Sequence, residues 1–400
     1  MPLFNIFHYL CAAFLIPTRQ NLFLMDLQTA YLQSVILLEK MIAIPSVSRE
    51  ETLVSDMLQD YLGGTGLTVH RSDNNLWLID PYYDAKRPTL LLNAHIDTVK
   101  PVSTWKHDPF CASREVVTLA DGSQEERIYG LGSNDDGASL VSLLHVFLML
   151  VGEGPSSDRR YNLIFLASAE EEVSGKHGIE SVLPQLPPID VALVGEPTGM
   201  QPAIAEKGLV VLDGIAHGKS GHAARNKGVN AIYLAMEAIE RLRSFRFERE
   251  SAMLGPVKVT VTGVQAGTVH NVVPDICTFM VDCRTTDAYS NEEVVEMLRE
   301  EVGKVASPMG SEGPVIELTP RSTRLQPSGI SVDHPLLKRI VALGRKPFGS
   351  PTLSDQALMR FPSLKMGPGD SARSHTADEY IRPSEIREAI EMYYEVLRWP

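Results

Sequence analysis

Three short runs of consecutive apolar residues constrain the fold of this chain more than any other feature. They are TLLLNAHID at 89–97, NLIFLASA at 162–169 and VALVGEP at 191–197. Apolar runs without polar alternation are typical of strands in a sheet that is covered on both faces. Residues 138–150 are apolar almost all round and predict a buried helix. This alternation predicts an α/β domain with a mostly parallel sheet and helices on both faces.

The pattern changes between residues 208 and 320. There the expected strands alternate apolar and polar residues, and the expected helices are amphipathic. In chain order the segments are strand 208–216, helix 229–245, strand 257–264, strand 276–284, helix 292–306 and strand 314–320. The order β-α-β-β-α-β is that of a ferredoxin-like fold. We therefore expect a small α+β domain inserted into the α/β domain, which would resume with helices at 335–345 and 384–398.

The domain bounds follow from this interruption. We expect the catalytic α/β domain at residues 26–207 and 321–400, and the inserted domain at residues 208–320. Residues 3–16 are apolar, but the segment is too short to span a bilayer. A secretory signal would have a Lys or Arg before its apolar segment, and none precedes residue 3. Met25 begins a segment that resembles an amphipathic helix from its first turn. We expect residues 1–24 to be a non-native or disordered extension, with a secretory signal as the alternative.

Charge and cysteine usage exclude several classes of function. The 400 residues carry a net charge of −13 without a run of Lys or Arg that follows a phosphate backbone. We therefore expect no nucleic-acid partner, and no membrane partner either. The four cysteines form no CxxC pair, which indicates a reducing cytoplasm rather than a disulfide framework or a thiolate zinc site.

Five residues of the metal-ligand type follow strand ends or turns. They are His95, Asp135, Glu172, Glu196 and His375. Imidazoles and carboxylates in this mixture suit divalent zinc, and one shared carboxylate can hold two ions roughly 3.5–4 Å apart. Each residue alone also has a structural interpretation, such as a strand-end acid or a loop histidine. Because sites in such sheets form beyond the carboxyl ends of the strands, the joint pattern predicts a metallohydrolase.

Acids beside these candidates suggest further roles. Residues 170–172 are three consecutive glutamates after a buried strand, which is costly unless a metal or solvent compensates them. One should bind metal and one should act as general base, although an acidic helix start is the alternative. Asp97 lies two residues after His95, on the same side of an extended segment, and can brace its ring. Asp136 is the expected N-cap of the helix at 138.

The motifs together resemble a known family. In chain order they are AHIDTV, G-x-GSNDDG, EEEVSGKHG, GEPTG, GKSGHAA, NVVPD followed by DCR, and GPGDSARSH followed by DEY. The set is similar to the dinuclear zinc amidohydrolases and peptidases, which include acetylornithine deacetylase, succinyl-diaminopimelate desuccinylase, aminoacylase and carboxypeptidase G. The resemblance covers nearly all of residues 26–400. It implies a zinc exopeptidase-like fold with an inserted lid that forms a homodimer, and two Zn²⁺ per subunit, with Co²⁺ or Mn²⁺ as substitutes.

The resemblance also implies metal and proton-transfer roles at matching positions. His95 and Glu196 would complete one metal site and Glu172 and His375 the other, with Asp135 bridging the two ions. Asp97 would orient His95. Glu171 would be the general base. Glu170 is the alternative, because Ala169 and Glu170 differ from the residues most common at these positions in the family.

Substrate contacts are implied in the same way. His222 would reach the neighbouring subunit's site and stabilise the oxyanion, while Asn271 and Arg284 would hold polar groups of the substrate. The loop around Gly369 would present backbone N–H groups to a carboxylate. Residues 354–355 are further candidates for substrate selection. Without the resemblance, we would interpret His222 as a loop histidine, Asn271 as a turn asparagine and Arg284 as a strand-end arginine.

The residue at position 196 separates two activities within the family. Deacylases tend to have Glu there and peptidases Asp, so Glu196 favours hydrolysis of an N-acyl-L-amino acid. The motif wording is closest to acetylornithine deacetylase-like proteins of arginine biosynthesis, with an acetyl or succinyl group on ornithine or citrulline. The alternatives are a succinyl-diaminopimelate desuccinylase, a metallo-exopeptidase such as a dipeptidase or carboxypeptidase, and a non-catalytic binding or dimerisation module.

Overall fold

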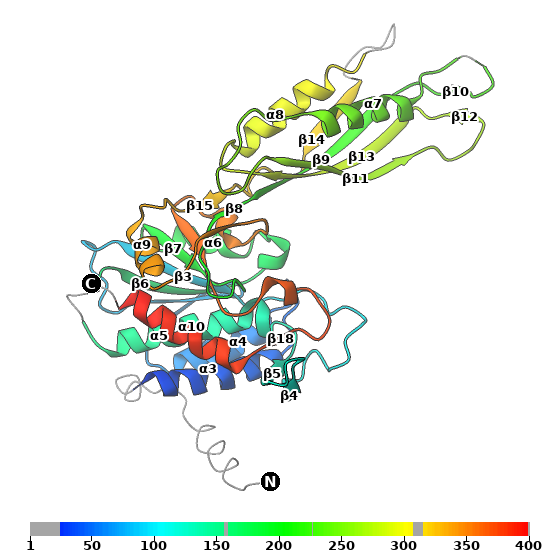
Figure 1. Ribbon diagram of the computed structural model, residues 1–400. Coiled ribbons are helices and arrows are strands. Elements are labelled where there is room, and N and C mark those ends of the chain that lie inside the picture. The colour runs from blue at the N-terminus through cyan, green and yellow to red at the C-terminus, as the bar shows by residue number, and fades with distance from the viewer. Residues whose placement is uncertain (1–24, 156–158, 226, 307–314, 399–400) are drawn as a thin grey trace. The chain divides into compact units, whose positions relative to one another are not determined.

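The computed structural model describes residues 25–155, 159–225, 227–306 and 315–398, and the chain forms two compact units (Figure 1). The first unit runs to Ile204 and takes up the chain again at Ile330–Phe348 and from Ser354 onward. The second unit contains Ala205–Gly329 and Gly349–Leu353. The chain thus returns briefly to the second unit, which the sequence pattern did not indicate. The expectation for residues 1–24 falls outside the described residues.

The first unit is built on a sheet with a parallel centre. The strand order is β1 (Val69–Ser72), β2 (Asn75–Ile79), β6 (Asn162–Ser168), β3 (Thr89–His95), β7 (Val191–Val194), β17 (Ser363–Lys365), β8 (Ala203–Glu206) and β15 (Ser328–Gly329), with β16 (Phe348–Ser350) also paired to β8. Strands β6, β3, β7 and β17 are mutually parallel, and the flanking pairs are antiparallel. The predicted mostly parallel sheet is therefore confirmed.

Helices cover both faces of this sheet. The helices of the unit are α3 (Leu27–Ile42), α4 (Thr52–Gly63), α5 (Ala138–Gly152), α6 (Ile179–Val182), α9 (Pro335–Ala342) and α10 (Pro383–Leu397). Figure 1 shows α3, α5 and α10 stacked together against one face. On β3, Leu90 and Leu92 join the core on the side of these helices, whereas Leu91 joins a second core with α6. Alternate residues are thus buried on opposite faces, which explains the continuous apolar runs.

Helix α5 is the buried helix that its composition predicts. All of its residues from Ala138 to Gly152 are buried. The segment Ser133–Gly152 is long and apolar enough to cross a membrane by length and composition, but 94% of its most apolar window is buried inside the unit. The helix is therefore a core element that packs against α3 and α10.

The second unit has the ferredoxin-like order that was predicted. Its main elements are β9 (Gly208–His217), α7 (Ala231–Ser244), β11 (Lys258–Ala266), β13 (Ile276–Thr285), α8 (Asn291–Val302) and β14 (Ile316–Pro320). The strands form an antiparallel sheet in the order β11-β13-β9-β14. Alternate residues of β9, including Val210 and Leu212, are buried in the core with α7 and α8.

The small sheet made by β4 (Ser113–Thr118), β5 (Gln124–Tyr129) and β18 (Tyr380–Ile381) was not predicted. Most residues of β4 and β5 are exposed or half-buried, so their sequences lack an apolar face. Strand β18 pairs with β5 from more than 250 positions away in the sequence, at Tyr380 and Tyr129. Such pairing depends on tertiary structure rather than on local pattern.

The first unit should lose stability in mild acid through His145. This ring is buried between α3, α4 and α5, with Nε2 2.8 Å from the Tyr61 hydroxyl and Nδ1 2.8 Å from the Val141 carbonyl oxygen. Burial lowers the pKa of His145 to about 4, so the unfolded state takes up a proton at higher pH than the folded state. The contribution is complete above the unfolded pKa of about 6.5 and is lost as the pH falls toward 4.

We therefore expect the free energy of unfolding to fall by about 2 kcal/mol between pH 7.5 and pH 5 because of this one group. Urea unfolding of the wild-type protein and of His145→Gln at both pH values measures the contribution. The glutamine does not titrate, so the variant should show a correspondingly smaller pH dependence. Equal pH dependence of the two proteins would contradict the assignment.

Candidate metal centre

The predicted ligands lie at one edge of the central sheet. Strand β3 ends at His95, β6 is followed by Glu170–Glu172, and β7 is followed by Glu196. Strand β17 leads into the loop that contains His375. Because these four strands are parallel, their carboxyl ends meet at the same edge, which is where α/β sheets form sites.

His95, Asp135 and Glu172 form a compact group. Each offers a ligand atom, and these atoms all lie within 4.8 Å of one another. Nε2 of His95 lies 3.2 Å from Oδ1 of Asp135, and the His95 side chain is only 2% exposed. Burial lowers the pKa of His95, but its contacts with Asp135 and Asp97 outweigh this and raise the pKa well above the ordinary value. Because their ligand atoms converge in this way, the three side chains can bind one cation together.

His375 contacts the same group from the other side. Its Nε2 lies 2.9 Å from Oε2 of Glu172 and 3.8 Å from Oδ2 of Asp135. The Asp135 carboxylate thus faces His95 with one oxygen and His375 with the other. His375 has a left-handed backbone with φ of 59°, which is uncommon for a residue with a side chain. This arrangement is the one that a bridging carboxylate between two ions requires.

Two further glutamates crowd the same edge. Burial raises the pKa of Glu196 well above its ordinary value, and the negative charges of Asp135 and Asp136 raise it further. Burial also raises the pKa of Glu171, with an added contribution from Glu196. Carboxylates so close together repel one another unless a cation lies among them.

This donor set fits divalent metal ions. Imidazole nitrogens and carboxylate oxygens are the usual ligands of zinc, and two histidines flank a shared carboxylate. The mutual repulsion of the acids is the electrostatic complement of a bound cation. Metal ions would therefore be held by His95, Asp135, Glu172, Glu196 and His375.

Asp97 has a wider role than bracing His95. Nδ1 of His95 lies 2.9 Å from the main-chain oxygen of Asp97 and 3.5 Å from its carboxylate Oδ1. The carboxylate accepts the backbone N–H groups of Glu171 and Glu172 at 3.0 and 3.1 Å. The Ser48 hydroxyl donates to the same carboxylate at 2.7 Å. Asp97 therefore ties the histidine strand to the glutamate turn.

The three consecutive glutamates point in different directions. Glu170 has a left-handed backbone with φ of 55°, and its carboxylate faces the backbone N–H of His177 at 3.4 Å. A Cβ on Gly175 would collide with this carboxylate, so the loop closes tightly around Glu170. Glu171 instead lies close enough to His95 and Glu196 for their charges to shift its pKa. This geometry favours Glu171 over Glu170 as a proton acceptor at the site.

The expectation that Asp136 caps the following helix is wrong. The turn Ser133–Gly137 leads directly into α5, and Gly137 takes the cap position without a side-chain hydrogen bond. Asp136 is buried instead, and burial raises its pKa to about 8. A cap must accept one of the first free N–H groups of the helix, and the buried carboxylate oxygens of Asp136 accept none of them.

The glycine-rich loop is held by Asn134. The Asp370 N–H donates to Oδ1 of Asn134 at 3.0 Å, and Nδ2 of Asn134 donates to the Asp370 carbonyl at 3.1 Å. Gly369 has φ of 88° and a Cβ there would collide with Asn134, so only glycine fits. Among the described residues no acceptor takes the Gly369 N–H. Ser354 and Asp355 are both buried, with 3% and 4% exposed, and the charge of Asp355 contributes to the raised pKa of Glu171. Their part in substrate selection stays a prediction.

The predicted substrate residues of the second unit occupy its hairpin and its sheet. His222 lies on β10 (Gly221–His222), which pairs with β12 (Val272–Val273), and the Ala223 N–H donates to the Asn271 carbonyl at 3.0 Å. His222 and Asn271 are therefore neighbours, and both are exposed. Arg284 on β13 already pairs with Asp282 through Nε and Nη2 at 3.0 and 3.2 Å. A substrate carboxylate would compete with Asp282 for this guanidinium.

Three positioning side chains were not predicted. Ser48 holds Asp97, and buried Glu51 accepts the backbone N–H of Glu170 at 3.2 Å. Glu379 is 2% exposed and accepts backbone N–H groups from the turn that carries Asp135. None has a recognisable spacing from the ligands it supports. Glu379 alone carried a signal, since it stands four positions after His375, within the DEY motif.

Known sequences and structures resemble this chain over most of its length. The sequence profile of peptidase family M20/M25/M40 matches residues 91–399. Acetylornithine deacetylase of Pectobacterium carotovorum is 27% identical over 77% of this chain and 79% of its own length. Succinyl-diaminopimelate desuccinylase of Paracoccus denitrificans is 26% identical over 67% and 71%. The structure of an M20 family metallo-carboxypeptidase from Sulfolobus solfataricus superposes with a TM-score of 0.68 at 18% identity, covering 94% of this chain and 99% of that one.

Proposed function

Because this chain belongs to peptidase family M20/M25/M40, whose members are metal-dependent hydrolases of amide bonds, we propose that it removes the acyl group from an N-acyl-L-amino acid. The preferred substrates are N-acetyl or N-succinyl derivatives of ornithine or citrulline, as in arginine biosynthesis. The relatives named acetylornithine deacetylase and succinyl-diaminopimelate desuccinylase support this class, at 27% and 26% identity.

One observation carries the proposal. The Asp135 carboxylate lies between His95 and His375, with Glu172 in contact with the second histidine. Glu171 stands beside this group as a carboxylate that binds to none of the ligand side chains through a hydrogen bond described in the structure. A cluster of metal-ligand side chains next to a separate carboxylate base suits metal-dependent hydrolysis of an amide.

Each side chain then has a defined task. His95 and Glu196 would hold one ion, Glu172 and His375 the other, and Asp135 both. Bound divalent ions would lower the pKa of a water molecule and polarise the scissile carbonyl. Glu171 would accept a proton from water at its carboxylate and return it to the leaving amine. Asp97 keeps Glu171 in place through its backbone N–H.

The proposed substrate contacts follow from the family resemblance. The Gly369 N–H would donate to a carboxylate of the substrate, and Asn271 and Arg284 would hold polar groups of the substrate. His222 would reach the site of the neighbouring subunit and stabilise the oxyanion there. We also propose zinc as the metal, two ions per subunit, a homodimer through the second unit, with that unit as the lid, and a cytoplasmic location. These follow from the family resemblance and, for the location, from cysteine usage.

A metallo-exopeptidase is the second candidate. The superposition on a metallo-carboxypeptidase favours it, although at 18% identity this shows the fold alone. The same metal ligands and the same base would then act on a peptide. The Glu196 carboxylate tilts the choice toward the deacylase, because deacylases of the family tend to have Glu at this position.

Amine release from a substrate panel distinguishes the two. We expect metal-replete protein to hydrolyse at least one of N-acetylornithine, N-acetylcitrulline or their succinyl counterparts. Its kcat/KM should be at least about 100-fold above that for any dipeptide, which is discrimination that differences in pocket contacts alone can supply. The protein incubated with chelator serves as the blank for each substrate. Turnover of dipeptides alone would reject the deacylase and leave the exopeptidase.

A further inference from the structure

The turn that carries Asp135 is held by one residue far along the chain. The Gly132 N–H donates to Oε2 of Glu379 at 3.2 Å, and the N–H groups of Asn134 and Asp135 donate to Oε1 at 2.8 and 2.9 Å. The Gly130 N–H donates to the main-chain oxygen of Glu379 at 3.1 Å. Four backbone donors within six residues therefore converge on position 379.

Glu379 itself is fixed from both sides. Its neighbour Tyr380 begins β18, which pairs with β5. The preceding Asp378 accepts the backbone N–H groups of Lys106 and His107 at 2.8 and 3.0 Å. The Glu379 side chain is 2% exposed, so it has no freedom to leave the turn.

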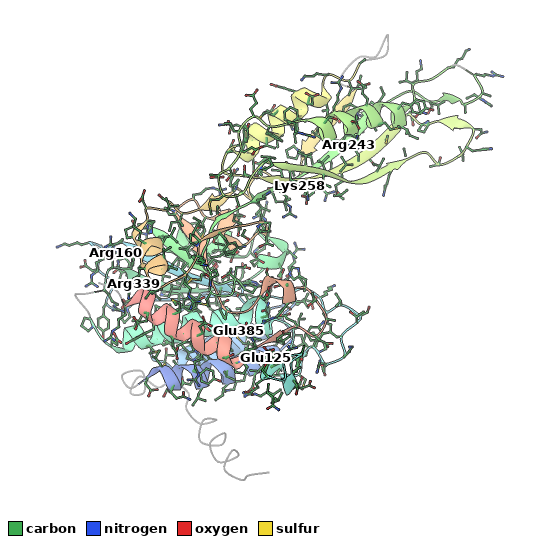
Figure 2. The ribbon with its side chains drawn as sticks, viewed as in Figure 1. Glu125, Arg160, Arg243, Lys258, Arg339 and Glu385 are labelled. Atoms are coloured by element: carbon green, nitrogen blue, oxygen red, sulfur yellow. The ribbon has the colours of Figure 1, made fainter. Side chains whose placement is uncertain are left out.

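The loop before Glu379, which contains His375, is anchored as well. Arg373 donates to Glu385 at 2.8 and 3.2 Å, and Arg382 joins Glu385 to Glu125 of β5. Figure 2 shows Glu385 on α10 and Glu125 on β5 in the same region of the first unit. At the other end, Asn134 binds Asp370 through two hydrogen bonds.

Position 379 thus connects the two loops whose side chains meet at the candidate metal centre. The Asp135 carboxylate has to face His95 and His375 at once, and a small shift of its backbone would break one of these contacts. Both oxygens of Glu379 are used by backbone donors, so its carboxylate supports the turn rather than a metal. Burial and the charge of Asp135 raise the pKa of Glu379 to about 8, whereas each of its three backbone donors lowers it, so these donors favour the ionised form. Hydrogen bonds to the ionised carboxylate are the stronger, charge-assisted kind.

We propose that Glu379 is a positioning residue that sets the Asp135 carboxylate for binding metal, by holding the backbone of residues 130–135 against the loop of His375. This rests on the proposed function, in which Asp135 bridges the ions. The expected consequence of losing Glu379 is weaker metal binding and a lower kcat, with KM little changed.

The test compares Glu379→Ala and Glu379→Gln with a matched control. Asp80→Asn is that control, because Asp80 is also a buried carboxylate, 2% exposed and paired with Arg159 at 3.1 Å. Its N–H donates to Leu163 near the start of β6, at the sheet edge opposite the metal centre. Co²⁺ serves as the probe, measured by calorimetric titration and by the visible absorption of the bound ion.

We expect the Co²⁺ dissociation constant of Glu379→Ala to rise about 10–100-fold, the usual effect of removing a group that orients a ligand, with an altered visible spectrum. In Glu379→Gln the amide oxygen can still accept the N–H groups of Asn134 and Asp135, but the amide NH₂ group faces the Gly132 N–H, which then has no acceptor. The Co²⁺ affinity of this variant should therefore lie between those of the alanine variant and the wild type. Asp80→Asn should lose thermal stability and keep the wild-type Co²⁺ affinity and spectrum.

The outcomes separate the inference from the function on which it rests. Wild-type affinity and spectrum in Glu379→Ala would overturn the inference alone, as would an equal loss of affinity in Asp80→Asn. If the alanine variant does not fold, the glutamine variant decides by the same two measurements. Wild-type protein that takes up no Co²⁺ would overturn the proposed function, and the inference with it.

Discussion

Replacing Glu171 by glutamine should lower kcat by a factor of about 10²–10⁴, which is the usual contribution of a general acid–base. The glutamine side chain has the same shape, and the backbone N–H of residue 171 still donates to the Asp97 carboxylate. The turn and the metal ligands should therefore stay in place. It cannot take a proton from water or return one to the leaving amine. Steady-state kinetics on the preferred substrate, with metal content measured in parallel, tests this.

Glu170→Gln is the matched control for this variant. The Glu170 carboxylate faces the His177 N–H and the space over Gly175, away from the candidate ligands. We expect its kcat to remain within a few-fold of the wild type, since a neutral acceptor can replace the carboxylate at that N–H. If Glu170→Gln were the inactive variant and Glu171→Gln the active one, the assignment of the base would be wrong.

Removing metal should abolish activity and also lower stability. Without cations the substrate carbonyl is not polarised and water keeps its ordinary pKa, so we expect a loss of kcat on the order of 10³-fold or more. The crowded carboxylates of Asp135, Glu171 and Glu196 would then repel one another unless they take up protons. A metal present at 1,000 times its Kd would stabilise the fold by about 4 kcal/mol, so the melting temperature should fall on chelation.

The measurement uses 1,10-phenanthroline with the non-chelating 1,7-isomer as control. Activity and melting temperature should fall with the chelator only, and both should return when Zn²⁺, Co²⁺ or Mn²⁺ is added back. The ion that restores the highest kcat/KM at equal occupancy identifies the preferred metal. Full activity after the chelator has reduced the metal content to zero would contradict the metal-dependent mechanism.

Much of the fold was predictable because its core elements have strong local patterns. The runs around Leu90–Leu92 and Leu163–Leu166 are buried on both faces, so every residue had to be apolar and the strands stood out. The alternating pattern of β9 and β13 identified the second, one-sided sheet equally well. The strands β4, β5, β17 and β18 were not predicted, because they are short or exposed and are stabilised by partners distant in sequence.

For the candidate site, the positions of the ligand residues were predictable from the sequence, whereas the directions of their side chains were not. Ligand-type residues after strand ends are local features, and parallel strands bring such ends to one edge whatever the details of packing. The direction of each side chain is not local. Glu170 and Glu171 are adjacent acids, yet one closes over Gly175 and the other lies by His95, because the turn has a left-handed backbone at Glu170.

The amino-acid pattern was sufficient for the architecture, the inserted unit, the family and the identity of the candidate ligands, because all of these depend on periodicity or on short motifs. It was not sufficient for the side chains that hold those ligands in place. Glu51 and Glu379 act by accepting backbone N–H groups, as Asp97 does in addition to its predicted contact with His95, and any residue can supply such a donor. The backbone partners of these carboxylates therefore leave no pattern in the sequence. They depend on which loops the folded chain brings together.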